Sequence, residues 1–274
     1  MQLAREHQTD IISADSRQCY KELSIGVARP TSEELEAVPH YFIATHSILE
    51  PVTAADFAAY ALRVSESLFK THDTIVMAGG TGLYVRAFTQ GLDEVPPTDP
   101  ALRAAIVTEY QEKGLAWLQE ELRRLDPAFA ASADMQNPQR MMRAMEVLKA
   151  TGRSIRSFQS GATVTRPFEV EKTGLELPRE TLYARINHRV DGMMEAGLLQ
   201  EVEGLIRDFE LAPGKPLPNA LQTVGYTELL DYCFGRCSLE EAVERIKTNT
   251  RHYAKRQMTW FRRDPEIRWI QPVS

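Results

Sequence analysis

Asp15 is the side chain in this sequence with the clearest prospects for chemistry. It follows residues 10–13, where two adjacent isoleucines predict a short buried strand. In open α/β sheets, ligands bind beyond the carboxyl ends of the strands, and Asp15 would lie there. Ser16, Arg17 and Gln18 come next and supply a hydroxyl, a cation and an amide. The pattern predicts an acid–base and hydrogen-bonding cluster, although an aspartate in this position can also simply cap the following turn.

A glycine-rich turn is the second place where chemistry is expected. Residues 74–78 have the composition of a buried strand, and Gly79-Gly80-Thr81-Gly82 follows directly. A strand, a glycine turn and a helix N-terminus can bind phosphate, because glycine lets backbone N–H groups approach the anion closely. Thr81 adds a hydroxyl at the helix start. The alternative is a tight turn with a capping threonine, since the lysine of a Walker A loop is absent.

Residues 97–163 are predicted to form an all-helical insertion, because no convincing strand pattern occurs there. Three helix starts share one device, an N-cap side chain followed by proline at the first helical position. They are Asp99-Pro100, Asp126-Pro127 and Asn137-Pro138. Arg140 and Arg143 on the last of these helices could bind phosphate, or could form a solvated face with Glu146 as their partner. Residues 1–96 and 164–274 mix strands and helices, so the fold class is α/β.

Two further helices carry cations that could meet phosphates. The helix that begins at Pro178 places Arg185, His188 and Arg189 on one face, and His188 is assigned no role. The final helix carries seven Lys or Arg residues and no acid between positions 245 and 263, with aromatic residues interleaved. Such a face suits a phosphate backbone, whereas the alternative is a solvated face with its aromatics in the core.

The remaining expected elements are defined by caps and short apolar runs. They are a helix tail over 2–8, capping boxes at Thr31, Thr53 and Ser238, a helix from Val224-Gly225-Tyr226, and strands within 42–49, 168–177 and 266–270.

Composition narrows the class of protein. An apolar content of 43% and a charged content of 26% are ordinary for a soluble enzyme. A net charge of −6 argues against nucleic-acid binding over the whole surface, but leaves room for a local basic face. The three cysteines have no metal-ligand spacing, and neither a signal peptide nor an apolar run of membrane-spanning length is visible. These features predict a reduced, cytoplasmic protein without structural zinc and without membrane contact.

Several segments, in the same order along nearly the whole chain, resemble the bacterial tRNA dimethylallyltransferases, also called tRNA isopentenyltransferases. The segments are Ile12-Ser13-Ala14-Asp15-Ser16-Arg17-Gln18-Cys19-Tyr20, Ile25-Gly26, Pro39-His40, Ala54-Ala55-Asp56-Phe57, Gly79-Gly80-Thr81-Gly82-Leu83-Tyr84, Asn137-Pro138-Gln139-Arg140, Val224-Gly225-Tyr226 and Lys255-Arg256-Gln257-Met258-Thr259-Trp260-Phe261-Arg262. The resemblance implies a parallel sheet flanked by helices, as in P-loop kinases, with an insertion that grips the anticodon arm.

The resemblance also implies a reaction and its residues. A dimethylallyl group would move from dimethylallyl diphosphate to N6 of the adenine next to the anticodon, with Asp15 as general base. Thr81 and Arg189, with Arg185 as a weaker candidate, would stabilise the diphosphate, which would carry Mg²⁺. The protein would act as a monomer on the tRNA anticodon stem-loop. The implied tRNA contacts are Asp15, Ser16, Arg17, Gln18, Thr81, Arg103, Gln139, Arg140, Met141, Met142, Arg143, Gln222, Thr223, Val224, Gly225, Tyr226 and Thr227.

The chain departs from the family pattern at three places. Val27 and Arg29 stand where Thr and Lys are usual, and Thr227 stands where a basic residue is common. The family's Gly-Pro-Thr-x-Ser-Gly-Lys-Thr/Ser phosphate loop does not occur in the 274 residues. The strands at 10–13 and 74–78 are therefore expected to flank a gap or to close abnormally, leaving unpaired backbone groups.

The absent phosphate loop also bears on activity and on the competing functions. The chain alone is expected to be inactive and poorly soluble until about 25–30 upstream residues are restored, enough for one strand, the loop and a helix start. A small-molecule kinase and a tRNA-binding protein without catalysis are the alternative functions.

Overall fold

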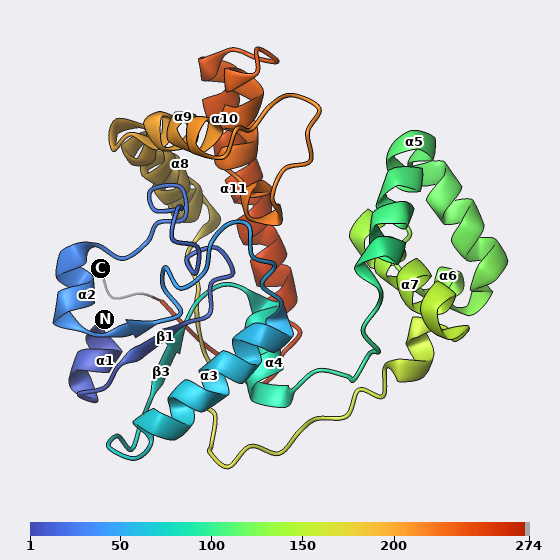
Figure 1. The fold of residues 1–274 in the computed structure, drawn as a ribbon. Coiled ribbons are helices and arrows are strands. Elements are labelled where there is room, and N and C mark those ends of the chain that lie inside the picture. The colour runs from blue at the N-terminus through green and yellow to red at the C-terminus, as the bar shows by residue number, and fades with distance from the viewer. Residues whose placement is uncertain (272–274) are drawn as a thin grey trace. The chain divides into compact units, whose positions relative to one another are not determined.

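The computed structural model describes residues 1–271 and divides into two compact units (Figure 1). Unit 1 is built from Met1–Gln90 and from Arg166 onward, and unit 2 is Gly91–Thr165. Unit 1 contains α1 (Gln2–Glu6), β1 (Ile11–Ser13), α2 (Ser32–Ala37), β2 (His40–Tyr41), α3 (Ala54–Leu68), β3 (Val76–Ala78), α4 (Gly82–Gln90), β4 (Thr173–Leu175), α8 (Arg179–Glu195), α9 (Leu198–Asp208), the 3₁₀ helix η2 (Asn219–Leu221), α10 (Tyr226–Cys233), α11 (Leu239–Phe261) and β5 (Arg268–Ile270).

The sheet of unit 1 is parallel and has β1 at its centre. Its strand order is β2-β1-β3, with Ile11 opposite both His40 and Val76. Ile11 and Ile12 are buried, as the adjacent isoleucines predict. The expectation of a gap between residues 10–13 and 74–78 is wrong, because β1 and β3 pair directly along their length. A second parallel pair joins β4 to β5.

The strand expected over 42–49 is also wrong. The backbone of Phe42 has φ = 65° and that of Ala44 has φ = 50°, both in the left-handed region that a strand cannot use. This segment is a loop whose N–H groups at Ala44 and Thr45 donate to the carbonyls of Gln18 and Cys19. The strand itself ends one residue earlier, at Tyr41. Of the expected 168–177 strand, only Thr173–Leu175 forms.

Two of the three capping boxes predicted in unit 1 form completely, and the one at Ser238 forms by half. Thr31 and Thr53 each form a capping box with the acid three residues later, and Ser238 accepts from the N–H of Glu241 at the start of α11. α3 packs along α4, and α11 contacts α10, α8 and α4. The longest helix of the core therefore reaches from the α8–α10 group to the helix that follows β3 (Figure 1).

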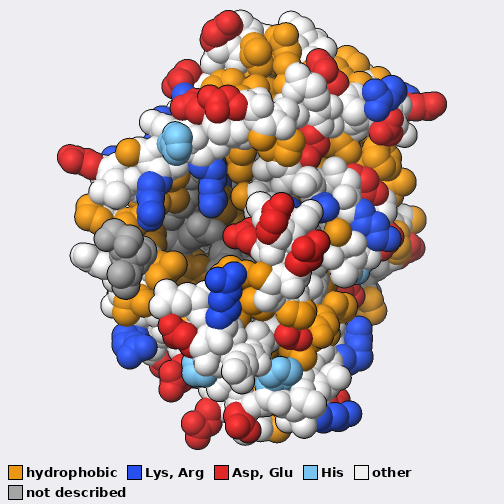
Figure 2. All heavy atoms as spheres, turned by 90° about the vertical axis from the view of Figure 1, so that its left-hand side faces the viewer, with side chains coloured by type: hydrophobic (Ala, Val, Ile, Leu, Met, Phe, Trp, Pro, Cys, Tyr) orange, Lys and Arg blue, Asp and Glu red, His pale blue; other side chains and the backbone are white. Residues whose placement is uncertain are grey.

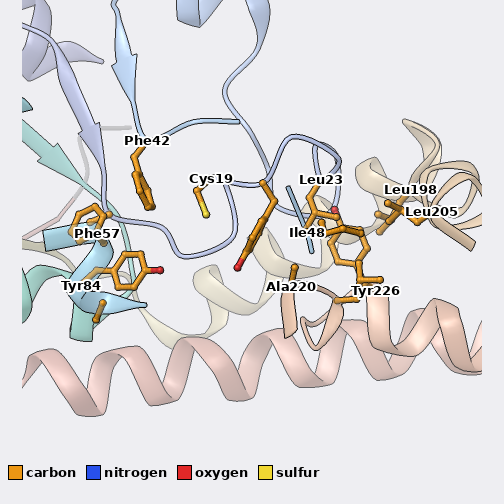
Figure 3. Close-up of a cluster of buried hydrophobic side chains, with 14 of the residues drawn as sticks. Cys19, Leu23, Phe42, Ile48, Phe57, Tyr84, Leu198, Leu205, Ala220 and Tyr226 are labelled. Atoms are coloured by element: carbon orange, nitrogen blue, oxygen red, sulfur yellow. The ribbon is translucent and has the colours of Figure 1, made fainter. Parts of the chain in front are cut away.

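The core of unit 1 runs from the loop after β1 to the start of α10 (Figure 3). At one end Phe57 stacks on Tyr84, with ring centroids 4.4 Å apart, and Phe42 meets Phe57 edge-on at 5.0 Å. Cys19 lies in the same cluster, and burial, helped by the charge of Asp15, raises the pKa of its thiol to about 12. The residues just after Asp15 are thus anchored in the core and hold that loop in place.

Unit 2 is entirely helical. It consists of α5 (Pro100–Leu125), α6 (Pro127–Ser132), α7 (Pro138–Thr151) and the 3₁₀ helix η1 (Ile155–Phe158). Asp99, Asp126 and Asn137 cap the three helices through their side chains, each with proline at the start, as predicted. α5 is kinked at Gly114, where φ is 78°. In the core of unit 2, α5 packs against α7.

The surface has mixed charge on the face seen in Figure 2, where Lys and Arg side chains are interspersed with Asp and Glu. No helix within residues 1–271 is both long and apolar enough to cross a membrane.

Candidate active site

The loop after β1 and the turn after β3 lie side by side at the carboxyl ends of their strands. The N–H of Ala14 donates to the carbonyl of Ala78 at 2.7 Å, and the N–H of Thr81 donates to the carbonyl of Ala14 at 3.1 Å. A Cβ on Gly79 would lie 2.4 Å from the backbone of Ala14, so only glycine permits this approach. Direct pairing of β1 with β3 therefore brings the two motifs predicted from the sequence into one site.

Asp15 uses one carboxylate oxygen to shape its own loop. Its Oδ1 accepts from the N–H of Arg17 at 2.8 Å and from the N–H of Gln18 at 3.3 Å. The capping alternative is therefore correct for this oxygen. Oδ2 accepts no hydrogen bond from any described residue. Asp15 is half-buried, so one oxygen fixes the carboxylate while the other is available to a ligand.

Thr81 is tied directly to the Asp15 loop. Its Oγ1 accepts from the N–H of Ser16 at 3.0 Å, and its hydroxyl donates to the Ser16 hydroxyl at 3.3 Å. Thr81 is thereby joined to the residue next to Asp15, in a small region that also contains the glycine turn. This region is the candidate active site.

Gln18 stabilises the loop after β1 through hydrogen bonds at both ends of its side-chain amide. Its Oε1 accepts from the Ser13 hydroxyl at 2.9 Å, and its Nε2 donates to the carbonyls of Val27 and Ala28 at 3.2 and 2.9 Å. Both ends of the amide are occupied within the protein. Arg29, one of the departures from the family pattern, donates to the carbonyls of Tyr20, Lys21 and Leu23 and closes the same loop.

α11 packs against the glycine turn, a contact that the sequence did not reveal. Gln257 Nε2 donates to the carbonyl of Gly80 at 2.9 Å. The indole of Trp260 lies so close to Gly82 that a Cβ there would be 2.2 Å from its nitrogen. Both residues belong to a segment that resembles the family, but the resemblance implies no role for them. The signal available in the sequence was their spacing, since positions 257 and 260 share one helical face.

Arg185 and Arg189 lie on the exposed face of α8, while Ile186 and Val190 turn into the core. Their side chains have no ion pair or hydrogen bond with any residue of the described chain. α8 is fastened to α11 by Arg251, which donates to Asn187 at 2.8 Å, and by the ion pair of Lys247 with Asp191. The helix that carries the two arginines is thus held in place, while their positive charges remain unpaired within the described chain.

The cations of α11 do not form a single free stripe. Arg245 pairs with Asp231, Lys247 with Asp191, and Arg262 with Glu176. Lys255 and Arg263 are exposed and have no partner among residues 1–271. Three of the seven cations are therefore committed to ion pairs within the described chain.

The turn over Gln222–Thr227 has both exposed and buried members. Gln222 and Thr227 are exposed and Thr223 and Val224 are half-buried. Tyr226 is a correction to the predicted tRNA contacts, because its side chain is completely buried and its hydroxyl donates to Glu201 at 2.5 Å. Gly225 is buried too, with φ = 99°, a conformation that suits glycine at this turn.

In unit 2, three of the residues predicted to contact tRNA lie around one buried acid. Glu146, 1% exposed, pairs with Arg103 at 2.6 Å and with Arg143 at 3.2 Å, and Gln139 accepts from Arg103 at 3.4 Å. Arg140, Arg143 and Arg156 line a cavity of about 340 Å³. Met141 and Met142, by contrast, are buried in the helical core, so predicting tRNA contacts for their side chains was wrong.

Comparison with known proteins identifies the family. The family model described as IPP transferase matches residues 18–264. The chain belongs to the IPP transferase family. A relative from Cytophaga hutchinsonii named tRNA dimethylallyltransferase is 45% identical over 98% of this chain and 86% of its own. One from Bacteroides thetaiotaomicron, named tRNA dimethylallyltransferase 1, is 43% identical over 99% of this chain and 86% of its own.

Solved structures agree with the fold of this IPP transferase family member. The tRNA isopentenylpyrophosphate transferase of Bacillus halodurans is 34% identical, with a TM-score of 0.68 over 98% of this chain and 84% of its own. A eukaryotic dimethylallyltransferase captured acting on tRNA has a TM-score of 0.80 at 24% identity, over 98% of this chain and 69% of its own. The latter likeness is one of fold, the P-loop-kinase-like architecture expected from the sequence. These matches favour a transferase over both a kinase and a binding protein.

Proposed function

We propose that this protein transfers a dimethylallyl group from dimethylallyl diphosphate to N6 of the adenine next to the anticodon in tRNA. The observation that carries the proposal is the juxtaposition of Asp15 with Thr81. The Ser16 hydrogen bonds to Thr81 hold the carboxylate and the threonine hydroxyl at one site. Relatives that match nearly the whole chain bear the name of this activity.

Asp15 supplies the proton acceptor. The exocyclic amine of adenine is a poor nucleophile, because its lone pair is delocalised into the ring. As the C–N bond forms, N6 must lose a proton, and a carboxylate within hydrogen-bond reach can take it. Oδ2 is the oxygen left for this task, since Oδ1 is held by two backbone N–H groups of its own loop.

The diphosphate leaves with the electron pair of the breaking C–O bond, so donors are needed where its charge develops. Thr81 and the glycine turn before α4 offer a hydroxyl and a backbone that can approach closely, and Arg189, with Arg185, offers free positive charge. Mg²⁺ would neutralise the diphosphate further. It binds through phosphate oxygens and water with one or two protein carboxylates.

The tRNA would be held by exposed polar side chains, in the cytoplasm and by a monomer. The target base lies in a single-stranded loop, so moving it into a pocket costs less than extruding it from a duplex. Arg103, Gln139, Arg140 and Arg143 in unit 2, and Gln222 and Thr227 in unit 1, keep exposed or half-exposed polar groups for this contact.

The test is direct. The full-length protein is incubated with dimethylallyl diphosphate, Mg²⁺ and an unmodified tRNA transcript, and nucleosides are analysed by mass spectrometry. We expect prenylated adenosine at the position next to the anticodon, and none when that adenine is replaced by guanine. Tight tRNA binding without product would support the non-catalytic alternative. Consumption of ATP with phosphorylation of a small molecule would support the kinase.

A further inference from the structure

Three side chains of α11 form one stripe that faces the candidate active site. Tyr253, Gln257 and Trp260 are four and three residues apart, a spacing that places them on the same face of a helix. Gln257 is fixed to the carbonyl of Gly80 at 2.9 Å, and Trp260 is packed on Gly82. Since the stripe follows the glycine turn, Tyr253 lies one helical turn further along, beside Thr81 and the Asp15 loop.

The environment of Tyr253 agrees with this placement. Burial raises the pKa of its phenol and the charge of Asp15 raises it further, while Thr81, Arg17 and Gln257 act in the opposite direction. The side chain nevertheless keeps 41% of its surface exposed. The ring therefore combines contact with the site and access for a ligand.

We propose that the Tyr253 ring contacts the dimethylallyl group and stabilises the positive charge that develops on it during transfer. This inference rests on the proposed function. With the amine at Asp15 and the diphosphate at Thr81, the reacting carbon lies between two groups that Tyr253 adjoins. As the C–O bond breaks, its electron pair leaves with the diphosphate. The N6 lone pair forms the C–N bond, and the N6 proton passes to Asp15.

An aromatic face attracts such charge through its quadrupole. The ring of Tyr253 already has one cationic neighbour, the Arg256 guanidinium, 5.6 Å from the ring centroid. A ring that served only as a platform for Arg256, or that stacked on the target adenine, would leave the developing charge without this partner. The experiment separates these roles.

The experiment measures single-turnover transfer by the full-length protein at saturating tRNA and dimethylallyl diphosphate. Tyr253→Leu is expected to slow the chemical step about tenfold, the usual size of a cation–π contribution, with tRNA affinity unchanged. Tyr253→Phe is expected to stay within about threefold of the parent on the same grounds. Tyr232→Leu on α10, a tyrosine outside this stripe, serves as the matched control and should leave the rate unchanged. Thermal unfolding checks the fold of each variant.

A fluorinated series then tests the charge itself. Phenylalanine carrying one, two or three ring fluorines at position 253 preserves shape and packing while it withdraws the electron density that attracts a cation. The rate constant is expected to fall stepwise along the series. A flat series would overturn the proposal in favour of plain apolar contact. A Phe variant as slow as the Leu variant would assign the role to the hydroxyl, and a weakened tRNA affinity at an unchanged rate would indicate stacking on the base.

The proposed function fails separately from this inference. If the parent protein gives no prenylated tRNA, the transferase assignment is wrong. If the parent is active and the Tyr253 variants match it, only the role of Tyr253 is wrong.

Discussion

Two pairs of arginines expected to meet phosphate groups are held in opposite ways. Arg185 and Arg189 on α8 are exposed and have no side-chain partner in the described chain. Arg103 and Arg143 in unit 2 share the buried carboxylate of Glu146. An unpaired cation keeps its full charge for a ligand, whereas a paired one gives up part of its field in exchange for a fixed orientation. The difference suggests two tasks, the stabilisation of a leaving group and the static gripping of a backbone.

The unit 2 cluster still carries net positive charge. Two guanidinium groups and one carboxylate leave one positive charge, and Arg140 stands beside them on α7. Thr98 donates to Glu146 and accepts from Arg143, which ties the start of the unit to α7. The cluster is thus pre-oriented without being neutralised.

Arg189→Gln should break the comparison most strongly. If Arg189 stabilises the departing diphosphate, the single-turnover rate should fall by roughly 10² to 10³, the usual cost of losing one such donor. The melting temperature should not change, because no partner is lost. Arg207→Gln on α9, another exposed arginine, is the control. A variant that loses stability and keeps its rate would place Arg189 in the fold rather than in the reaction.

Glu146→Gln should show the opposite signature, a loss of stability together with weaker tRNA binding. Removing the charged acceptor of two arginines should lower the free energy of unfolding by about 1–3 kcal/mol. Urea denaturation measures this loss, and filter binding measures tRNA affinity. Glu121→Gln provides a control, because Glu121 pairs with Arg124 at the surface of the same unit. Parent-like values for both quantities would show that Arg103 and Arg143 do not depend on Glu146.

α11 also carries both unpaired and paired cations, and the salt dependence of tRNA affinity can distinguish them. Neutralising Lys255 and Arg256 together should reduce the slope of log affinity against log salt by about two, near one per phosphate contact. Adding Arg251→Gln should change the slope less, because Arg251 donates to Asn187. Neutralising the ion-paired Arg245 and Lys247 should hardly alter it. Equal slopes in all variants would assign every one of these cations to internal packing.

Replacing Asp231 should have the smallest effect, a change in the free energy of unfolding that depends on pH. Burial raises the pKa of its carboxyl, but hydrogen bonds and charge from Arg245 and Arg236 outweigh this and lower it. A lowered folded-state pKa stabilises the protein above the unfolded value and loses that contribution as pH falls through the folded value. Both arginines are about half exposed, so the contribution should stay under about 1 kcal/mol.

Urea denaturation of the parent and Asp231→Asn at about pH 7 and about pH 3 checks this. The difference in unfolding free energy between the two proteins should shrink at the lower pH. A difference that is the same at both pH values would show that the carboxylate charge is not its source.

The sequence predicted the local features of this molecule well. Strand β1, Asp15 just beyond it, the glycine turn and the proline-marked helix starts are all encoded within a few residues. The prediction of tRNA contacts for Tyr226, Met141 and Met142 was wrong, because a sequence motif identifies a segment but not the direction in which each side chain points. The prediction of a strand over 42–49 was wrong, because an apolar run does not reveal that a residue such as Phe42 has a positive φ.

The contact between α11 and the glycine turn lay beyond prediction for a different reason. Gln257 and Gly80 are separated by 177 positions, and only the packing of α11 against α4 brings them together. The pairing of the α11 cations has the same origin, since the acids that bind them lie on other segments.

Asp15→Asn tests the central claim most directly. Asparagine keeps an oxygen that can accept from the N–H groups of Arg17 and Gln18, so the loop should keep its shape, while the proton acceptor is lost. Single-turnover transfer should slow by roughly 10² to 10⁴, as expected for a lost general base, and tRNA affinity should stay near that of the parent. Asp15→Ala, which also removes the loop cap, should in addition lower the melting temperature. A loss below tenfold in Asp15→Asn would contradict the assignment of Asp15 as the base.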